Sequence, residues 1–254
     1  MGQFFTVDVK PTIAASKQHA AFAAGDVLFG WTEFEVPKGS HALLSVTALV
    51  RPKGDATPTV NRFPFSLVFA KTDDTSLGTV NDAADHVPNN DFLGQIEFEA
   101  ANFSHSALQS TAVVSTGKGS NSGTTYNPMV LTPDPTTGSS VGYNKLYVGC
   151  IAAGAFDFSS INAIAEDGDA EAASTQVITM DGTSMDVREH FIDGDIVHIG
   201  TSVGTPAADS LIGTVASADS STQITLDAVS ATALVDGDIL YNIHPMRLIL
   251  SFAS

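Results

Sequence analysis

The sequence predicts an all-β protein: an antiparallel β-sandwich or jelly-roll-like domain with a small β-barrel inserted before its last strand. Short apolar runs of strand length recur along the 254 residues. Segments rich in Gly, Pro, Asn and Ser separate these runs, as turns do. A distinctly acidic segment, with runs of its own, precedes the final run. Many short strands with such punctuation are typical of sandwiches and small barrels.

Seven runs are expected to build the sandwich: 4–9, 42–50, 63–70, 92–99, 110–116, 145–153 and 246–252. The last run alternates, because Met246, Leu248, Leu250 and Phe252 fall on one face and the residues between them on the other. Alternation of this kind predicts a half-buried strand. We expect runs 145–153 and 246–252 to be neighbours in one sheet.

The stretch 12–25 allows two interpretations. It fits a helix with Thr12 as its N-cap and Gly25 just past its end. The following "AAGDVLFGW" also resembles a Gly-Asp turn that leads into a strand. The sequence does not decide between them.

The acidic segment 161–243 is expected to form the inserted barrel, and residues 1–160 with 244–254 the sandwich. Its strand-like runs are 175–180, 193–200, 211–217, 221–229 and 236–243. The chain would leave the sandwich after Phe158 and return at Pro245. Proteolysis near Ser160 and Asn242 is expected to release the insert.

Charge and cysteine content exclude several functions. The net charge is −17, and segment 161–243 holds Arg188 as its only basic residue against 14 acidic ones. Phosphate backbones and anionic membranes would be repelled, so we expect neither nucleic acid nor a membrane as partner. Cys150 is the only cysteine, which excludes an intrachain disulfide and a cysteine-based metal site. No stretch of 18 apolar residues predicts a membrane span.

Two near-copies, "DGDIVHIG" at 193–200 and "DGDILYNI" at 236–243, raise the question of ion binding. An Asp-Gly pair makes a tight turn, since Gly accepts positive φ and the Asp side chain bonds nearby backbone. We therefore favour turns that start strands over carboxylate ion ligands. Ion binding remains the alternative.

Other motifs carry little chemistry. "GTSVG" at 200–204 matches a nucleophile elbow centred on Ser202, but Pro206 and a further strand follow where a helix is needed. "EDGDAE" at 166–171 fails the EF-hand pattern, although another calcium site on the acidic loops stays open. "GKGSNSGTT" at 117–125 lacks the P-loop spacing, and the seven histidines are scattered. We expect no catalytic residues, no cofactor and no metal site.

Three segments carry a resemblance to a known family. The opening Phe22–Gly30, with Leu67–Phe69 and the loop Val80–Ala84, resembles the "YxxGDVxG", "LxLF" and "xDNAAF" patterns of tailed-phage virion structural proteins, marine cyanophage ones included. The similarity covers roughly residues 4–155 and the last strand. The insert resembles acidic "GDxIxI…GDxLY" modules of phage structural proteins, and the shorter relatives lack it.

This resemblance implies a non-enzymatic capsid decoration or cement protein on the capsid surface of a virion. Its expected partners are the major capsid protein and further copies of itself, as a homotrimer. Gly2, Gln3, Phe4 and Phe5 are the candidate contact residues; an ordinary edge strand explains them equally well.

The alternative is a tail or head-fibre appendage whose insert binds a host receptor. A receptor site would need exposed aromatic residues, and the insert holds only Phe191 and Tyr241. A hydrolase acting through Ser202 is the third reading.

Overall fold

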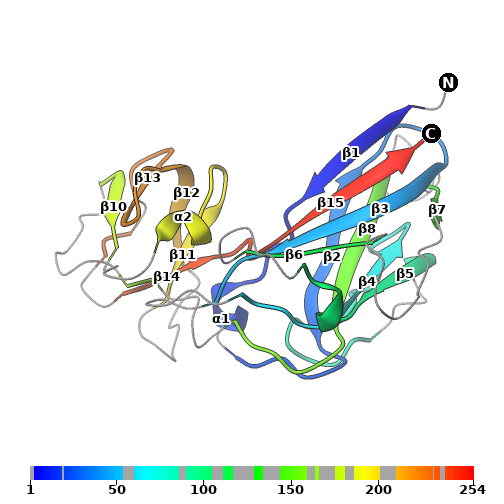
Figure 1. Ribbon diagram of the computed structural model, residues 1–254, viewed down its shortest axis with the longest axis horizontal. Coiled ribbons are helices and arrows are strands. Elements are labelled where there is room, and N and C mark those ends of the chain that lie inside the picture. Colours follow the sequence, from blue (N-terminus) through cyan, green and yellow to red (C-terminus); the bar gives the residue numbers. More distant parts are fainter. Residues whose placement is uncertain are drawn as a thin grey trace.

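The computed structural model describes residues 3–18, 20–53, 60–85, 90–104, 111–116, 129–133, 144–158, 164–165, 175–180, 186–200, 210–230, 232–234 and 238–254. The fold is all-β, as predicted, and consists of three antiparallel sheets. Two of them face each other as a sandwich, and the third forms the insert at the other end of the molecule (Figure 1). No helix among the described residues is long and apolar enough to cross a membrane.

The first sandwich sheet is built around the last strand of the chain. Strand β15 (Met246–Ala253) lies between β1 (Phe4–Val9) and β3 (His41–Val50), and β6 (Ala112–Ser115) and the short β7 (Met129–Leu131) both pair with β3. Buried and half-buried residues alternate along β15 as its sequence predicts. The apolar face of this strand is therefore fixed towards the core.

The second sheet has the order β2 (Val27–Glu35), β8 (Lys145–Ala152), β4 (Phe65–Ala70) and β5 (Phe92–Phe98). The prediction that segments 145–153 and 246–252 are neighbours is wrong, because β8 pairs with β2 and β4 while β15 belongs to the facing sheet. Both strands are apolar, and apolar content alone does not select a sheet.

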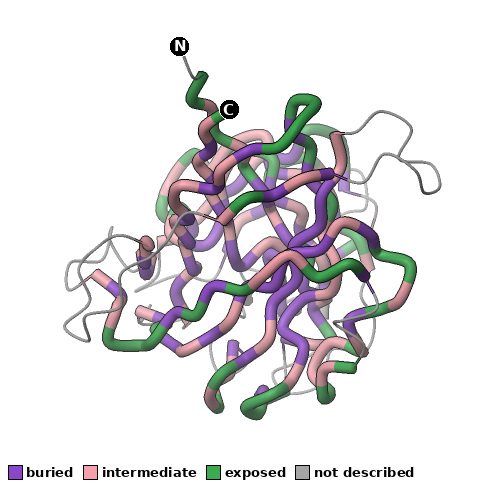
Figure 2. The backbone as a smooth tube through the Cα atoms, turned by 90° about the vertical axis from the view of Figure 1, so that its right-hand side faces the viewer, coloured by how far each residue is buried: buried purple, intermediate pink, exposed green. Residues whose placement is uncertain are grey.

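The sandwich core fills the space between the two sheets. Phe252 of β15 stacks on Phe34 of β2 with ring centroids 6.3 Å apart, and Phe34 meets Phe69 of β4 edge-on at 6.4 Å. Seen from the end that carries the termini, buried stretches of the tube gather inside and exposed ones lie on loops and edges (Figure 2). Cys150 is fully buried in this core.

Among the described residues of 12–25 the only helix is the short α1 (Ala15–Gln18), so a helix from Thr12 to Gly25 is not formed. Gly25 has φ +96° and precedes β2, which confirms the Gly-Asp turn as the lead into that strand. A 3₁₀ turn, η2 (Ala100–Asn102), lies elsewhere in the sandwich.

Two of the segments that carry the family resemblance, Phe22–Gly30 and Val80–Ala84, lie against each other. Val27 N–H donates to the carbonyl of Asp82 at 2.8 Å, and Ala84 N–H donates to the carbonyl of Gly25 at 3.0 Å. Val27 and Trp31 then pack with Leu77 on the outer side of the second sheet. The "GDV" opening and the "NDAA" loop thus form one local unit.

The insert is an antiparallel sheet of six strands, β9 (Ile164–Ala165), β10 (Val177–Thr179), β11 (Ile196–Gly200), β12 (Ser210–Ala218), β13 (Gln223–Leu226) and β14 (Ile239–Asn242), with a short helix α2 (Val187–His190). Its order β10-β13-β12-β11-β14-β9 is open, since no pairing among the described residues joins β10 to β9. The predicted closed barrel is therefore corrected to an open sheet. It has an apolar core of its own around Phe191, Val197 and Leu240.

Candidate functional site

The first Asp-Gly-Asp copy forms a turn at the junction between insert and sandwich. Asp195 N–H donates to the carbonyl of Ile192 at 3.0 Å, and Gly194 adopts φ +78°, a conformation that favours glycine. The turn directs the Asp195 side chain inward, where the residue is only 1% exposed. Its Oδ2 accepts a bond from Ile192 N–H at 2.9 Å. The turn predicted from sequence is present, and its last residue is a buried charge.

Two cations of the sandwich compensate this buried carboxylate. Arg51, just after β3, donates from Nη2 to Asp195 Oδ2 at 3.1 Å, and Lys10, just after β1, places Nζ 3.5 Å from Oδ1. Asn242 of the insert adds a bond from Nδ2 to Oδ2 at 2.8 Å. A buried charge is tolerated only when it is paired and hydrogen-bonded in this way. Asp195 therefore joins the two domains.

Further hydrogen bonds join the segment around α1 to the end of the insert. Ile13 N–H donates to the carbonyl of Ile243 at 2.8 Å. Gln18 is fully buried, and its Nε2 donates to the carbonyls of Ile13 and Asn242 at 2.7 and 2.8 Å. Asn242 itself is only 7% exposed, and the expected proteolytic cut near this residue stays a prediction. Ser160, the other expected cut, lies outside the described residues.

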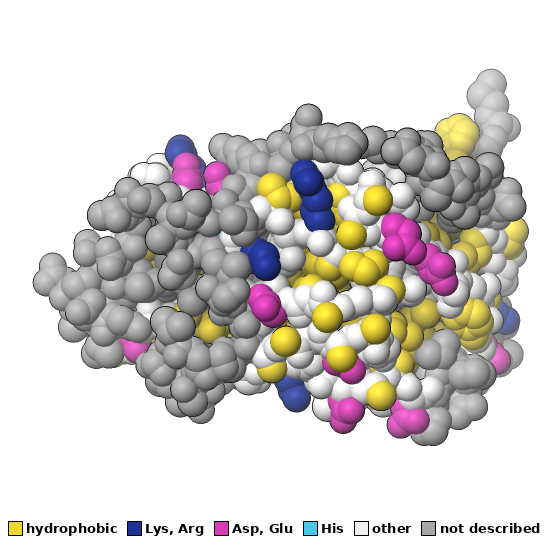
Figure 3. All heavy atoms as spheres, turned by 60° about the horizontal axis from the view of Figure 1, so that its bottom comes forward, with side chains coloured by type: hydrophobic (Ala, Val, Ile, Leu, Met, Phe, Trp, Pro, Cys, Tyr) yellow, Lys and Arg dark blue, Asp and Glu magenta, His cyan; other side chains and the backbone are white. Residues whose placement is uncertain are grey.

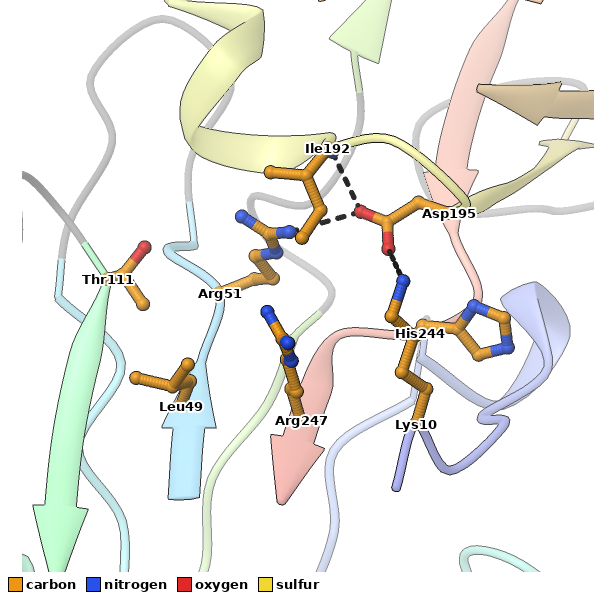
Figure 4. A pocket seen from close by; sticks show the side chains of 8 residues that line it. All are labelled: Lys10, Leu49, Arg51, Thr111, Ile192, Asp195, His244 and Arg247. Carbon is orange, nitrogen blue, oxygen red and sulfur yellow. Dashed lines mark hydrogen bonds and ion pairs between the residues drawn. The ribbon is translucent and has the colours of Figure 1, made fainter. Parts of the chain in front are cut away.

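A pocket of about 190 Å³ opens beside this ion pair, and we call it the junction pocket. In Figure 4 three basic side chains converge on it from the sandwich, and Asp195 and Ile192 face them from the insert. Its lining residues are Lys10, Leu49, Arg51, Thr111, Ile192, Asp195, His244 and Arg247.

Arg247 and Arg51 both line this pocket, but their pKa values are shifted in opposite directions. Arg247 binds Asp8 of the neighbouring strand through Nε, 2.8 Å from both carboxylate oxygens, and through Nη2. This hydrogen bond raises the pKa of Arg247. Burial lowers the pKa of Arg51, and the positive charge of Arg247 lowers it further. The carboxylate of Asp195 acts in the opposite direction and raises this pKa.

His244 lines the same pocket on the return of the chain to the sandwich. Burial lowers its pKa, nearby Asp195 opposes this, and Lys10 and His198 lower it further. Its Nε2 lies 3.4 Å from Thr12 Oγ1, and its buried Nδ1 has no partner within the part of the chain that the structure describes. The neutral imidazole is therefore the form that the fold favours.

The N-terminal candidates divide between packing and exposure. Gln3 accepts a bond at its carbonyl from Ser254 N–H at 3.0 Å, and Phe5 stacks on Phe252 with ring centroids 5.2 Å apart. Phe4 is 77% exposed on β1, which lies at the edge of its sheet. Gly2 lies outside the described residues. The edge strand is therefore present, and a contact role for these residues stays a prediction.

The remaining motifs fall largely outside the described residues: Ser202 with 201–209, 166–171, 117–125, and Asp236 and Gly237 of the second Asp-Gly-Asp copy. Asp238 of that copy is buried. Over the described ranges, no group of three or more His, Cys, Asp or Glu residues is placed to hold a metal ion. Phe191 and Tyr241, the insert's aromatic residues, are each 1% exposed and so are not available as receptor contacts.

The sequence predicts the turn at Asp193–Asp195 but not the cations that bind the Asp195 carboxylate. Arg51 and Lys10 lie 144 and 185 positions before Asp195, and no local pattern connects residues at such distances. No pattern in the sequence marks Lys10, Arg51 and Arg247 as neighbours, and only the folded chain brings them into one pocket. No family model matches the chain, and no curated protein matches it either.

Proposed function

We propose that this protein is a non-enzymatic capsid decoration or cement protein of a tailed phage, located on the capsid surface of the virion. In this proposal the sandwich binds the lattice of the major capsid protein and stabilises the head. The acidic insert projects away from the shell. Copies associate as a homotrimer, which suits the three-fold positions of a capsid lattice.

The observation that carries the proposal is the two-ended arrangement of the molecule. The termini and the edge strand β1 lie at one end, and the insert lies at the other (Figure 1). The insert segment 161–243 contains 14 acidic residues and one basic residue, so most of the net charge belongs to the projecting end. The rest of the chain holds 10 basic and 14 acidic residues, so its small net charge opposes close packing little.

The surface of the sandwich supports this orientation. One face shows apolar and uncharged side chains over its centre, basic side chains beside that centre and acidic side chains towards its margins (Figure 3). Phe4 and Val130 are 77% and 63% exposed. Extended contacts between proteins use flat surfaces with an apolar centre and a polar rim.

The edge strand offers a second means of attachment. The outer edge of β1 pairs with no strand among the described residues, which leaves its backbone groups available to add a strand from another chain. The resemblance of Phe22–Gly30 and Val80–Ala84 to phage virion proteins supports the same class of function.

Particle imaging and head binding test the proposal. An averaged image of the intact virion is expected to place the chain on the shell in hundreds of copies; a dozen or fewer copies at the tail would contradict it. Purified protein is expected to cosediment with heads from a phage that lacks the gene. Phe4→Ser should weaken this binding, whereas Val229→Ser, which alters a 57% exposed apolar residue of the insert, should not.

A further inference from the structure

We infer that the junction pocket binds a small carboxylate that carries a short apolar group, held by both domains at once. Residues of the sandwich supply the cations, and Ile192 and Asp195 of the insert close the other side (Figure 4). A ligand in this position would bridge the junction, because neither domain lines the pocket alone.

The charge of the pocket selects an anion. Lys10, Arg51 and Arg247 face a single lining carboxylate, Asp195. Asp8 binds Arg247 from outside the pocket, which leaves an excess of one positive charge. This excess is notable in a chain with a net charge of −17. A monoanion would neutralise it.

Hydrogen-bond donors remain for that anion. Arg51 donates from Nη2 to Asp195 and from Nη1 to the carbonyl of Glu189 at 3.3 Å, and Arg247 uses Nε and Nη2 for Asp8. Within the described ranges Arg51 Nε and Arg247 Nη1 have no acceptor. Lys10 Nζ makes only long contacts, 3.4 and 3.5 Å. Guanidinium groups bind carboxylates with good geometry.

The apolar part of the pocket lining selects the rest of the ligand. Leu49 and Ile192 present apolar surface, and Thr111 adds a methyl group. A volume of about 190 Å³ admits a carboxylate with a few carbon atoms. A phosphate dianion would carry more negative charge than the single excess positive charge of the pocket. It would also leave the apolar surface of Leu49 and Ile192 without a contact. Two sources offer the favoured chemistry: a free short-chain acid, and an acidic side chain of a neighbouring protein.

Sodium butyrate is the probe that tests the site, with sodium chloride at equal ionic strength as the reference. In two-dimensional ¹H–¹⁵N spectra we expect saturable shifts of the Ile192 and Asp195 amides and of Arg51 Nε–H. Acetate should bind more weakly, since it lacks the apolar stem. Shifts that chloride reproduces, or shifts located away from the pocket, would overturn the inference.

Two variants distinguish binding at the junction pocket from non-specific binding of anions to surface cations. Arg247→Gln should weaken butyrate binding at least fivefold; its side chain is 38% exposed, so the fold should persist. Arg188→Gln removes a similar charge from the surface of the insert and should leave binding unchanged. Equal affinity of Arg247→Gln and the parent protein would refute the site.

A second variant covers the case in which Arg247→Gln does not fold. Thr111→Glu places a carboxylate at the rim of the pocket and should compete with butyrate, so that binding is lost. Retained binding in this variant would refute the site. A short peptide with an internal Glu distinguishes the sources: tighter binding than butyrate indicates a partner protein, and weaker binding indicates a free acid.

Discussion

Arg51 Nη2 and Asp195 Oδ2 lie 3.1 Å apart although 144 positions separate the two residues in the chain. One belongs to the end of a sandwich strand and the other to a turn of the insert. The pair joins the sandwich and the insert, and Lys10 supports it from the sandwich side.

Asp195→Ala should lower the free energy of unfolding by about 3 kcal/mol, because it leaves the cations Arg51 and Lys10 partly buried without their carboxylate. Chemical denaturation measures this loss. Glu33→Gln, which breaks the exposed pair with Lys145, is the matched control and should have no measurable effect. A loss for Asp195→Ala no larger than that of the control would show that the junction does not depend on this charge.

Gly194→Ala should lower the free energy of unfolding by roughly 1–2 kcal/mol, since a side chain is strained at φ +78°. Gly30→Ala is the control, because Gly30 has no positive φ and its added methyl group would meet nothing within 4 Å. Thermal or chemical unfolding of the two variants gives the comparison. Equal stability would mean that the turn does not need glycine.

Stability should fall as the pH decreases from neutrality through 6.5, owing to His244. The folded pKa of His244 lies below its ordinary value of 6.5, so between these two values the unfolded chain binds a proton that the folded chain does not. Acid therefore favours unfolding in this window. His244→Gln should show a smaller drop in the free energy of unfolding, and NMR titration of the imidazole should give a pKa below 6.5.

Cys150 should not react with thiol reagents in the folded protein. Burial raises its pKa well above the ordinary value, so the thiolate that reacts is scarce and inaccessible. In guanidinium chloride one thiol per chain should react within minutes. Rapid labelling of the native protein at pH 8 would place Cys150 outside the core.

The sequence by itself determined the local features of this protein. Alternation along 246–252 gave a half-buried strand, because side chains of a strand point to opposite faces in turn. Gly194 marked a turn, because positive φ is a property of a single residue. These signals act over a few positions and depend on no distant contact.

Only the tertiary structure decided which strands are neighbours and what Asp195 does. β8 and β15 are both apolar, and their assignment to facing sheets follows from pairing with strands far away in the chain. The sheet of the insert is open because its edge strands β10 and β9 do not pair among the described residues, and the sequence of each strand does not show this. The sequence predicts only a turn residue at Asp195. Folding buries its carboxylate, and a buried carboxylate requires cations to balance its charge. Lys10 and Arg51 meet that requirement only once both domains are in place.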